Sequence, residues 1–275
     1  MSHKNNLVVG IASAALIALM LCPIISAEEP QKITDSTSVE ELKILASKGN
    51  ADAMFQLGEK LIPEQGIDSG ATEALQWLQK AADAGKIQAW YDLGFIYANT
   101  AGVKTDLLRA INYWKTGAEK GNADCQASMG LVCQAGERIP GGVKADPAEA
   151  AKWYKLAADQ NQQEAIFHLA QLYLWGEGVK KDSVEAAKWF GKGAEAGNPD
   201  AQWMLGMCYH KGAGIEKDNV QAYALISAAI DGVQNPEQKK GMSEQLDKLG
   251  KEMTLEQVSK GQELSKEWIA KKNKE

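Results

Sequence analysis

Apolar and polar residues follow one another along this chain with the period of an amphipathic helix, and one helical pattern returns five times. Each copy contains a large apolar residue followed by a small residue: Leu57-Gly58, Leu93-Gly94, Met129-Gly130, Leu169-Ala170 and Leu205-Gly206. The successive spacings are 36, 36, 40 and 36 residues. A fixed period of this size is typical of proteins built from stacked helical units. The sequence therefore predicts helix pairs repeated in series.

A loop and a second helix are predicted after each of these pairs. Each loop contains a glycine followed by valine or isoleucine, and we expect the first helix to end at this glycine, which tolerates positive φ: Gly66, Gly102, Gly142, Gly178 and Gly214. In four of the five units an aspartate follows, and its side chain is expected to cap the second helix: Asp106, Asp146, Asp182 and Asp218. Gly70 takes the place of this aspartate in the first unit.

The second helix of each unit has a small residue and then two bulky residues at fixed places. An alanine stands four residues after the cap, which allows close approach of a neighbouring helix: Ala74, Ala110, Ala150, Ala186 and Ala222. The seventh and eighth residues after the cap are large, and we expect them in the core: Trp77-Leu78, Tyr113-Trp114, Trp153-Tyr154, Trp189-Phe190 and Leu225-Ile226.

This pattern resembles that of the Sel-one-like repeat (SLR) family, which is related to tetratricopeptide repeats. The fourth unit has nearly all residues of the family motif: Ala165, Leu169, Tyr173, Gly176, Gly178, Val179, Asp182, Ala186, Trp189, Ala194 and Gly197. The resemblance covers residues 50–233 and departs from the motif at Ala170, Cys133 and Leu225. It implies an all-α fold, a right-handed α-solenoid of about five helix-turn-helix repeats similar to tetratricopeptide repeats.

Helices are also predicted on both sides of the repeats, where they would cover the ends of the solenoid. Residues 28–49 are expected to form an N-terminal capping segment, with its helix over residues 38–48. Residues 234–275 are expected to form a C-terminal helical cap with helices over 236–253 and 255–271. Thr254 and Gln257 have the spacing of a capping box at the start of the last helix.

Residues 1–27 have the pattern of an export signal. One lysine precedes a run of 19 residues, 7–25, without charged side chains, and a small residue, Ala27, precedes two glutamates. We predict cleavage after Ala27 and a periplasmic or secreted mature chain. The alternative is an uncleaved membrane anchor, since 19 apolar residues are about the minimum that spans a bilayer. Cys22 is not expected to carry a lipid, because Leu21 precedes it where a small residue is required.

Composition and charge narrow the class of partner. The chain is 45% hydrophobic and has a formal net charge of −6, which argues against binding to a nucleic-acid backbone. After signal cleavage no membrane segment is expected.

Cys125 and Cys133 lie eight residues apart in one predicted helix, which places them about 12 Å apart, beyond the reach of a disulfide. With Cys208 they are predicted to be buried thiols.

No short catalytic or metal-binding motif is found in the mature sequence, so we expect neither an enzyme nor a bound cofactor or metal. The two histidines after residue 27, His168 and His210, have no neighbour at metal-ligand spacing. Some cysteine-rich bacterial members of the family have been linked to β-lactams, which gives an enzymatic alternative. This sequence lacks an S-x-x-K motif after residue 27 and also lacks the paired cysteines of that subgroup.

A candidate binding surface follows from the geometry of tetratricopeptide-like solenoids, in which the first helix of each unit lines the concave face. Two residues before the leucine position of the Leu-Gly pairs, four of five units have an aromatic residue: Phe55, Tyr91, Phe167 and Trp203. This aromatic row would suit a peptide with apolar anchors. The alternative is that its side chains pack in the core. We add His210, five residues after the leucine position, as a further candidate contact.

A second row lies five residues before the leucine position and is mostly acidic: Asp52, Gln88, Asp124, Glu164 and Asp200. The acidic side chains could bind a basic partner. They also lie in the first turn of their helices, where a carboxylate interacts favourably with the helix dipole, and we favour this second explanation.

The sequence as a whole predicts a non-enzymatic scaffold that binds a protein or peptide on its concave face, as an adaptor or regulator in the periplasm or outside the cell. The resemblance implies this class of function. A membrane-anchored assembly scaffold is the alternative if the N-terminal segment stays attached. The sequence specifies neither the identity of the partner nor an oligomeric state.

Overall fold

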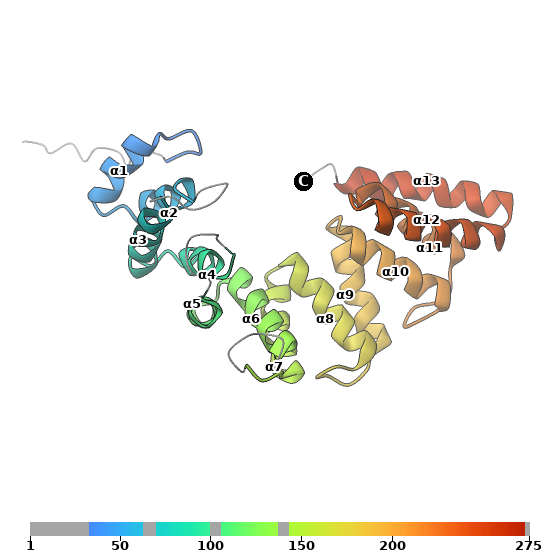
Figure 1. Ribbon diagram of the computed structural model, residues 1–275. Helices are drawn as coiled ribbons and strands as arrows, with labels where there is room; N and C mark the ends of the chain where they lie inside the picture. The colour runs from blue at the N-terminus through green and yellow to red at the C-terminus, as the bar shows by residue number, and fades with distance from the viewer. Residues whose placement is uncertain (1–32, 63–69, 100–105, 137–142, 273–275) are drawn as a thin grey trace, which may run out of the picture. The chain divides into compact units, whose positions relative to one another are not determined.

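The computed structural model describes residues 33–62, 70–99, 106–136 and 143–272 (Figure 1). Two compact units are present, residues 1–37 and 38–275, and the helices that the structure describes belong to the second. The described residues contain no β-strand, and their helices are α1 (Val39–Ser47), α2 (Ala51–Lys60), α3 (Gly70–Asp83), α4 (Ala89–Asn99), α5 (Leu107–Glu119), α6 (Ala123–Ala135), α7 (Pro147–Asp159), α8 (Gln163–Trp175), α9 (Ser183–Glu195), α10 (Pro199–Lys211), α11 (Asn219–Gly232), α12 (Pro236–Lys251) and α13 (Leu255–Lys272).

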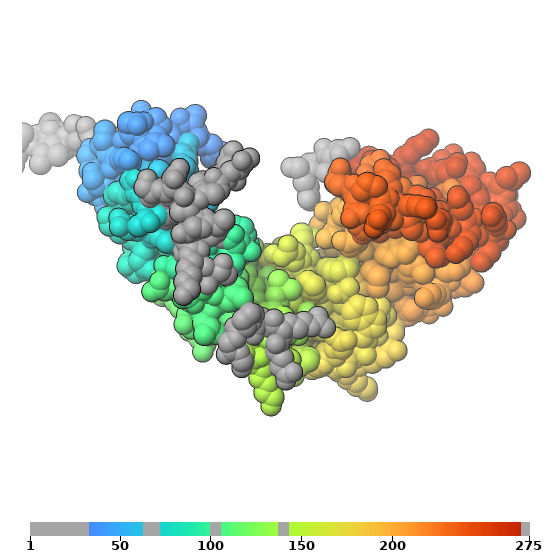
Figure 2. Space-filling model, viewed as in Figure 1, coloured from blue at the N-terminus to red at the C-terminus, as the bar shows by residue number. Residues whose placement is uncertain are grey.

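Five helix pairs form the repeats, and each helix from α1 to α11 packs against the next one along the chain (Figure 1). We call α2, α4, α6, α8 and α10 the first helices and α3, α5, α7, α9 and α11 the second helices. The first helix α6 also contacts α4 and α8, so equivalent residues of adjacent repeats lie side by side there. Successive repeats occupy successive stretches of the surface in Figure 2. The predicted all-α solenoid is confirmed.

The aspartates predicted to cap the second helices do so. The carboxylates of Asp106, Asp146, Asp182 and Asp218 each accept a hydrogen bond from a backbone N–H in the first turn of α5, α7, α9 and α11. The backbone N–H of each of these aspartates also donates to a carbonyl in the last turn of the first helix before it. This backbone bond to Cys133 is present although cysteine replaces the motif tyrosine there. The cap and the backbone bond together fix the angle between the two helices of a pair.

The prediction that the first helices end at the glycine before the valine or isoleucine is wrong for Gly178 and Gly214. Helix α8 ends at Gly176 and α10 ends at Gly212, both with left-handed backbone, and their N–H groups satisfy carbonyls of the last turn. Gly178 and Gly214 lie two residues further on, also with positive φ, and contact the start of the preceding second helix. Their role is therefore to let two repeats approach closely. The other predicted end glycines, Gly66, Gly102 and Gly142, lie outside the described residues.

The small residue of each Leu-Gly pair makes room for a large side chain of the second helix. A Cβ at Gly94 would overlap the Trp114 indole, and one at Gly130 would overlap the Tyr154 ring. The alanines four residues after the caps are fully buried. Of the bulky pairs, the eighth residues are buried apart from the half-buried Trp114, whereas the seventh residues are half-buried apart from the buried Leu225. The prediction that these residues lie in the core is therefore confirmed for four of the five eighth residues. Among the seventh residues it is confirmed for Leu225 alone.

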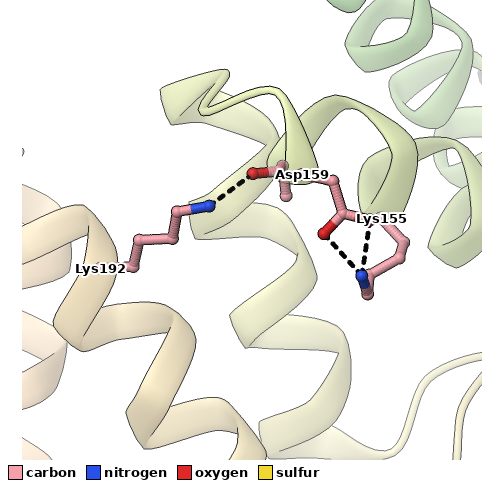
Figure 3. Close-up of polar contacts among 4 residues, drawn as sticks. Lys155, Asp159 and Lys192 are labelled. Atoms are coloured by element: carbon pink, nitrogen blue, oxygen red, sulfur yellow. Dashed lines mark hydrogen bonds and ion pairs between the residues drawn. The ribbon is translucent and has the colours of Figure 1, made fainter.

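Polar contacts also connect adjacent repeats. Lys192 of α9 donates to the Ala158 carbonyl at the end of α7, at 2.8 Å (Figure 3). Lys155 of α7 pairs with the Asp159 carboxylate at 2.6 Å (Figure 3). The ammonium groups of both lysines lie over the Trp189 ring, at 5.4 Å for Lys155 and 5.2 Å for Lys192. A cation at the C-terminal end of a helix interacts favourably with the helix dipole, so the Lys192 contact stabilises the junction between the third and fourth repeats.

Helices flank the repeats at both ends, as predicted. Helix α1 packs on α2, and α13 lies along α11, where the Tyr223 ring contacts Gly261 (Figure 1). The predicted capping box is confirmed, because Thr254 and Gln257 each accept a hydrogen bond from the other's backbone N–H. The division into residues 28–49, 50–233 and 234–275 stays a prediction.

The cysteines lie in the helices as thiols. Cys125 and Cys208 are buried, Cys133 is half-buried, and none of the three forms a disulfide. Burial is the main cause that raises the pKa of all three thiols, which disfavours the reactive thiolate.

The predicted signal peptide, its cleavage after Ala27 and the unlipidated Cys22 all lie outside the described residues. Among the helices that the structure describes, none is long and apolar enough to cross a bilayer.

Candidate functional site

The aromatic row lies on the first helices, but its side chains are half-buried against neighbouring helices. Phe55 packs on a cluster from α3 and α4, and Tyr91 packs on one from α5 and α6. Phe167 contacts a cluster that includes Phe190, and Trp203 packs on residues of α11 and α12. Phe55, Tyr91 and Phe167 therefore help to join one repeat to the next, whereas Trp203 joins the last repeat to α12. Each ring presents only part of its surface. Its role in recognition stays a proposal.

His210 stands apart from this row in the last turn of α10. Its Nδ1 atom lies 3.2 Å from the Oδ1 atom of Asn219, the first residue of α11. This contact ties the ring to the second helix of its own repeat. The candidate histidine therefore lies at one end of the first helix, about two turns from Trp203.

Three large apolar side chains on the described first helices are exposed and were missed by the sequence reasoning: Trp175, the last residue of α8, and two residues that share one repeat position. Phe95 of α4 is 43% exposed and Leu131 of α6 is 40% exposed. Both stand two residues after the leucine position, on helices that contact each other. The Tyr91 ring stacks on Phe95 with centroids 6.3 Å apart, so an exposed ring continues from the half-buried row. Together Tyr91, Phe95 and Leu131 form the apolar part of the candidate site.

Three carboxylates from three different first helices act on the hydroxyl group of Tyr91. Burial raises the pKa of the Tyr91 hydroxyl, and the charges of Asp124, Glu164 and Asp92 raise it further. These side chains come from α6, α8 and α4. One hydroxyl is therefore affected by negative charge from three adjacent repeats.

Asp92 is the most perturbed of the three acids. Burial, followed by the charges of Glu59 and Asp124, raises the pKa of its carboxyl group to about 7. Its Oδ2 atom is buried and has no hydrogen-bond partner within the described part of the chain. A carboxylate in this position is costly, because it is partly buried beside two other negative charges and forms no ion pair in the described residues.

The outer members of the acidic row have partners. Asp52 pairs with Lys86, and Asp200 accepts a hydrogen bond of 2.7 Å from Gln238. Both Asp124 and Glu164 lie in the first turn of their helices, so the dipole explanation holds for them as well. The dipole explains why an acid is tolerated at this position. It does not explain why three acids lie near one tyrosine without a cation.

A further row directly precedes the leucine position, and sequence reasoning missed this one too. Its members Gln56, Asp92 and His168 each have a buried polar atom without a hydrogen-bond partner in the described residues. The His168 ring stacks on Tyr154 with centroids 5.1 Å apart, and burial lowers its pKa, which favours the neutral imidazole. The first helices therefore present unsatisfied polar groups at the same place in three repeats. No metal-binding group of three or more His, Cys, Asp or Glu residues occurs in the part of the chain that the structure describes.

Comparison with protein families assigns the repeats. A family model, Sel1 repeat, matches residues 51–86, 87–122, 123–162, 163–198 and 199–232. The chain belongs to the Sel1 repeat family. Each match begins at the first residue of a first helix or within two residues of it, so the repeat unit of the family is the helix pair of this structure. The resemblance inferred from the motif residues is confirmed.

Solved structures of similar proteins share the fold. A protective antigen of uropathogenic Escherichia coli displaying an SLR fold is 31% identical, with a TM-score of 0.74, over 85% of this chain and 48% of that chain. A Sel1 repeat protein from Oxalobacter formigenes is 26% identical, with a TM-score of 0.61, over 76% of this chain and 90% of that chain. An uncharacterized protein of Neisseria meningitidis serogroup B is 27% identical over 99 residues, which are 36% of this chain and 19% of that protein.

This Sel1 repeat chain therefore spans about half the length of the Escherichia coli antigen and a smaller part of the Neisseria protein. Sel1 repeats form a non-enzymatic scaffold fold that is typical of protein–protein interaction. The family thus defines the general class of function. The surface and the partner have to be inferred from the residues of this chain.

Proposed function

We propose that this Sel1 repeat protein binds a protein or peptide partner on the face of its first helices. The observation that carries the proposal is the exposure of Phe95 and Leu131 at equivalent positions of adjacent helices, next to Tyr91 of the aromatic row. Clustered apolar side chains on an otherwise polar surface mark interaction sites more often than single ones do. In a solenoid the first helices line the concave face, which suits an extended or helical ligand.

The aromatic row has a supporting part in this proposal. Phe55 and Phe167 hold adjacent repeats together, Trp203 holds the last repeat on α12, and all three expose part of their rings on the first helices. Truncating them would disturb the solenoid as well as the surface, so they are poor probes of binding. Phe95 and Leu131 are better probes, because neither belongs to a buried cluster.

We also propose that the protein works without catalysis and outside the cytoplasm, as an adaptor or regulator. The apolar run at residues 7–25 and the small residue at Ala27 support export. Mass spectrometry of the chain purified from its producing cell tests this point. A mature N-terminus at Glu28 supports the exported form, whereas an intact N-terminus supports the membrane-anchored scaffold.

Replacing Phe95 and Leu131 together with alanine is expected to weaken partner binding at least about tenfold, because truncated apolar anchors at the centre of an interface typically cost more than 1 kcal/mol each. Affinity capture from the envelope and the culture medium of the producing cell identifies a partner. Calorimetry with that purified partner then measures the loss. Circular dichroism is expected to show unchanged helix content, since both side chains are exposed.

The matched control replaces Leu108 and Leu156 with alanine. These leucines are 49% and 48% exposed and lie on the second helices α5 and α7. The control variant is expected to retain the partner. Equal loss in both variants, or equal retention in both, would contradict binding on the first-helix face.

A further inference from the structure

We propose that the face formed by α4, α6 and α8 binds a partner segment in which a lysine or arginine is flanked by apolar side chains, with the cation among Asp92, Asp124 and Glu164 and the apolar side chains on Phe95 and Leu131. This inference rests on the proposed function, because it defines the chemistry of the segment that the first helices bind.

The charge of the first helices is one-sided. Residues five, two and one before the leucine position, and two after it, share one face of a helix. Among the twenty residues at these positions in the five first helices there is no lysine or arginine. Six of the twenty are carboxylates: Asp52, Glu59, Asp92, Asp124, Glu164 and Asp200. A cationic partner is therefore complementary to this face.

The middle of the face is where this charge is uncompensated. In the described residues no ion pair reaches Asp92, Asp124 or Glu164, and the carboxylate of Asp124 accepts a long hydrogen bond of 3.5 Å from Gln162. The Tyr91 hydroxyl senses all three charges. Like charges at a partly buried site repel one another more strongly than they would in water. A cation from a partner would relieve this repulsion.

The apolar side chains lie beside the carboxylates in the same repeats. Phe95 follows Asp92 by three residues on α4, and Leu131 follows Asp124 by seven residues on α6, so each pair lies on one side of its helix. The stem of a lysine or arginine is itself apolar and packs along such side chains while its charged end reaches a carboxylate. An exposed ring such as Phe95 also attracts a nearby cation.

The same charge argues against a second copy of this chain as the occupant. Two copies that met through this face would bring Asp92, Asp124 and Glu164 of each copy together, and this face has no lysine or arginine to place between them. An acidic or purely apolar segment would leave the three middle carboxylates unpaired and less hydrated. The carboxylates therefore select a basic segment, while Phe95 and Leu131 contribute apolar contact.

The test uses the full chain and a pair of probe peptides, blocked at both ends, that alternate leucine with arginine or with citrulline. Citrulline keeps the shape of arginine and removes its charge. At pH 8 and about 0.1 M salt, where exposed charges are screened beyond about 10 Å, calorimetry is expected to show at least tenfold tighter binding of the arginine peptide.

The carboxylates are tested with a triple variant: Asp92→Asn, Asp124→Asn and Glu164→Gln. We expect at least tenfold weaker binding of the arginine peptide. A matched control removes the same charge from the ends of second helices, where all three residues are exposed: Glu119→Gln, Glu195→Gln and Asp231→Asn. The control is expected to bind within about twofold of the parent chain, since its carboxylates lie elsewhere.

Three results would overturn the inference: no binding of the arginine peptide at millimolar concentration, equal binding of the citrulline peptide, or an equal loss in the control variant. The proposed function fails separately. A captured partner whose binding depends on Phe95 and Leu131 but not on the three carboxylates would support the proposed function. The same result would contradict the inference that the bound segment is basic.

Discussion

Replacing Gly178 with alanine is expected to lower the free energy of unfolding by about 3 kcal/mol or more, because two penalties act together. Gly178 has φ of +69°, a region that side chains with a Cβ atom rarely adopt. An added Cβ would also overlap the backbone of Pro147 and Ala148 at the start of α7, and backbone atoms cannot move aside as a flexible side chain can. Urea unfolding followed by circular dichroism measures the effect.

The matched control is Gly191→Ala in the middle of α9. A Cβ there meets no atom within 4 Å, and its φ lies outside the left-handed region. Alanine is the better helix former, so this variant is expected to be more stable by up to about 1 kcal/mol. If Gly178→Ala destabilises the protein and Gly191→Ala stabilises it, the loss at Gly178 is due to the contact between α7 and the Gly178 loop. A general intolerance of glycine replacement would destabilise both variants. A stable Gly178→Ala variant would show that the close approach of the two repeats is dispensable.

The contact between Gly178 and the start of α7 is also expected to affect the cooperativity of unfolding. In a repeat solenoid each unit contacts mainly its neighbours, and the coupling between units determines whether the chain unfolds in one step. Gly178 belongs to the fourth repeat and contacts the second helix of the third. Its replacement is therefore expected to split or broaden the urea transition. The Gly191 control is expected to keep the transition of the parent chain.

The fold could be predicted from the sequence because its determinants are local and recur. An aspartate cap, a buried alanine four residues later and a small residue after the leucine position each act within one helix pair. Five copies of such signals leave little ambiguity. The end of the first helix was misplaced, because Gly176 and Gly178 both adopt positive φ and the sequence does not show which one faces the neighbouring repeat.

The candidate site could be predicted only in part, because exposure depends on contacts between repeats. The aromatic row is visible in the sequence, yet nothing in it reveals that the next repeat half-buries Phe55 or Phe167. Phe95 and Leu131 share their repeat position with Glu59, Gln171 and Met207, so the position mixes polar and apolar residues. Burial in the folded chain is the property that distinguishes Phe95 and Leu131.

The raised pKa of Asp92 could not be predicted from the sequence either, because it also depends on contacts between repeats. Asp92 stands in an unremarkable helical pattern, and the sequence gives no reason to separate it from the exposed acids. Its environment is made by distant residues, since the charges that act on it come from Glu59 of α2 and Asp124 of α6. Stacking of the first helices creates this environment. The property therefore belongs to the assembled solenoid and not to one repeat.

Replacing Asp92 with asparagine is expected to stabilise the protein above pH 7, on the order of 2 kcal/mol, and to change it little near pH 4. The pKa of Asp92 is raised to about 7 in the folded chain, from an ordinary value of 3.8. Because folding raises this pKa, the stabilising contribution is fully present below about pH 4 and is lost as the pH rises through about 7. Each tenfold change in proton affinity corresponds to about 1.4 kcal/mol, and solvent at the partly exposed carboxylate reduces the full value.

Urea unfolding of the parent chain and the Asp92→Asn variant between pH 4 and pH 8 measures this difference. Asp231→Asn is the control, since it removes an equal charge from an exposed aspartate of α11. A difference between parent and Asp92→Asn that stays constant with pH would mean that the gain comes from amide packing and not from the proton. A difference that grows between pH 5 and pH 8, and is absent in the control, would show that the chain maintains a costly carboxylate on its first-helix face, where a bound cation would offset that cost.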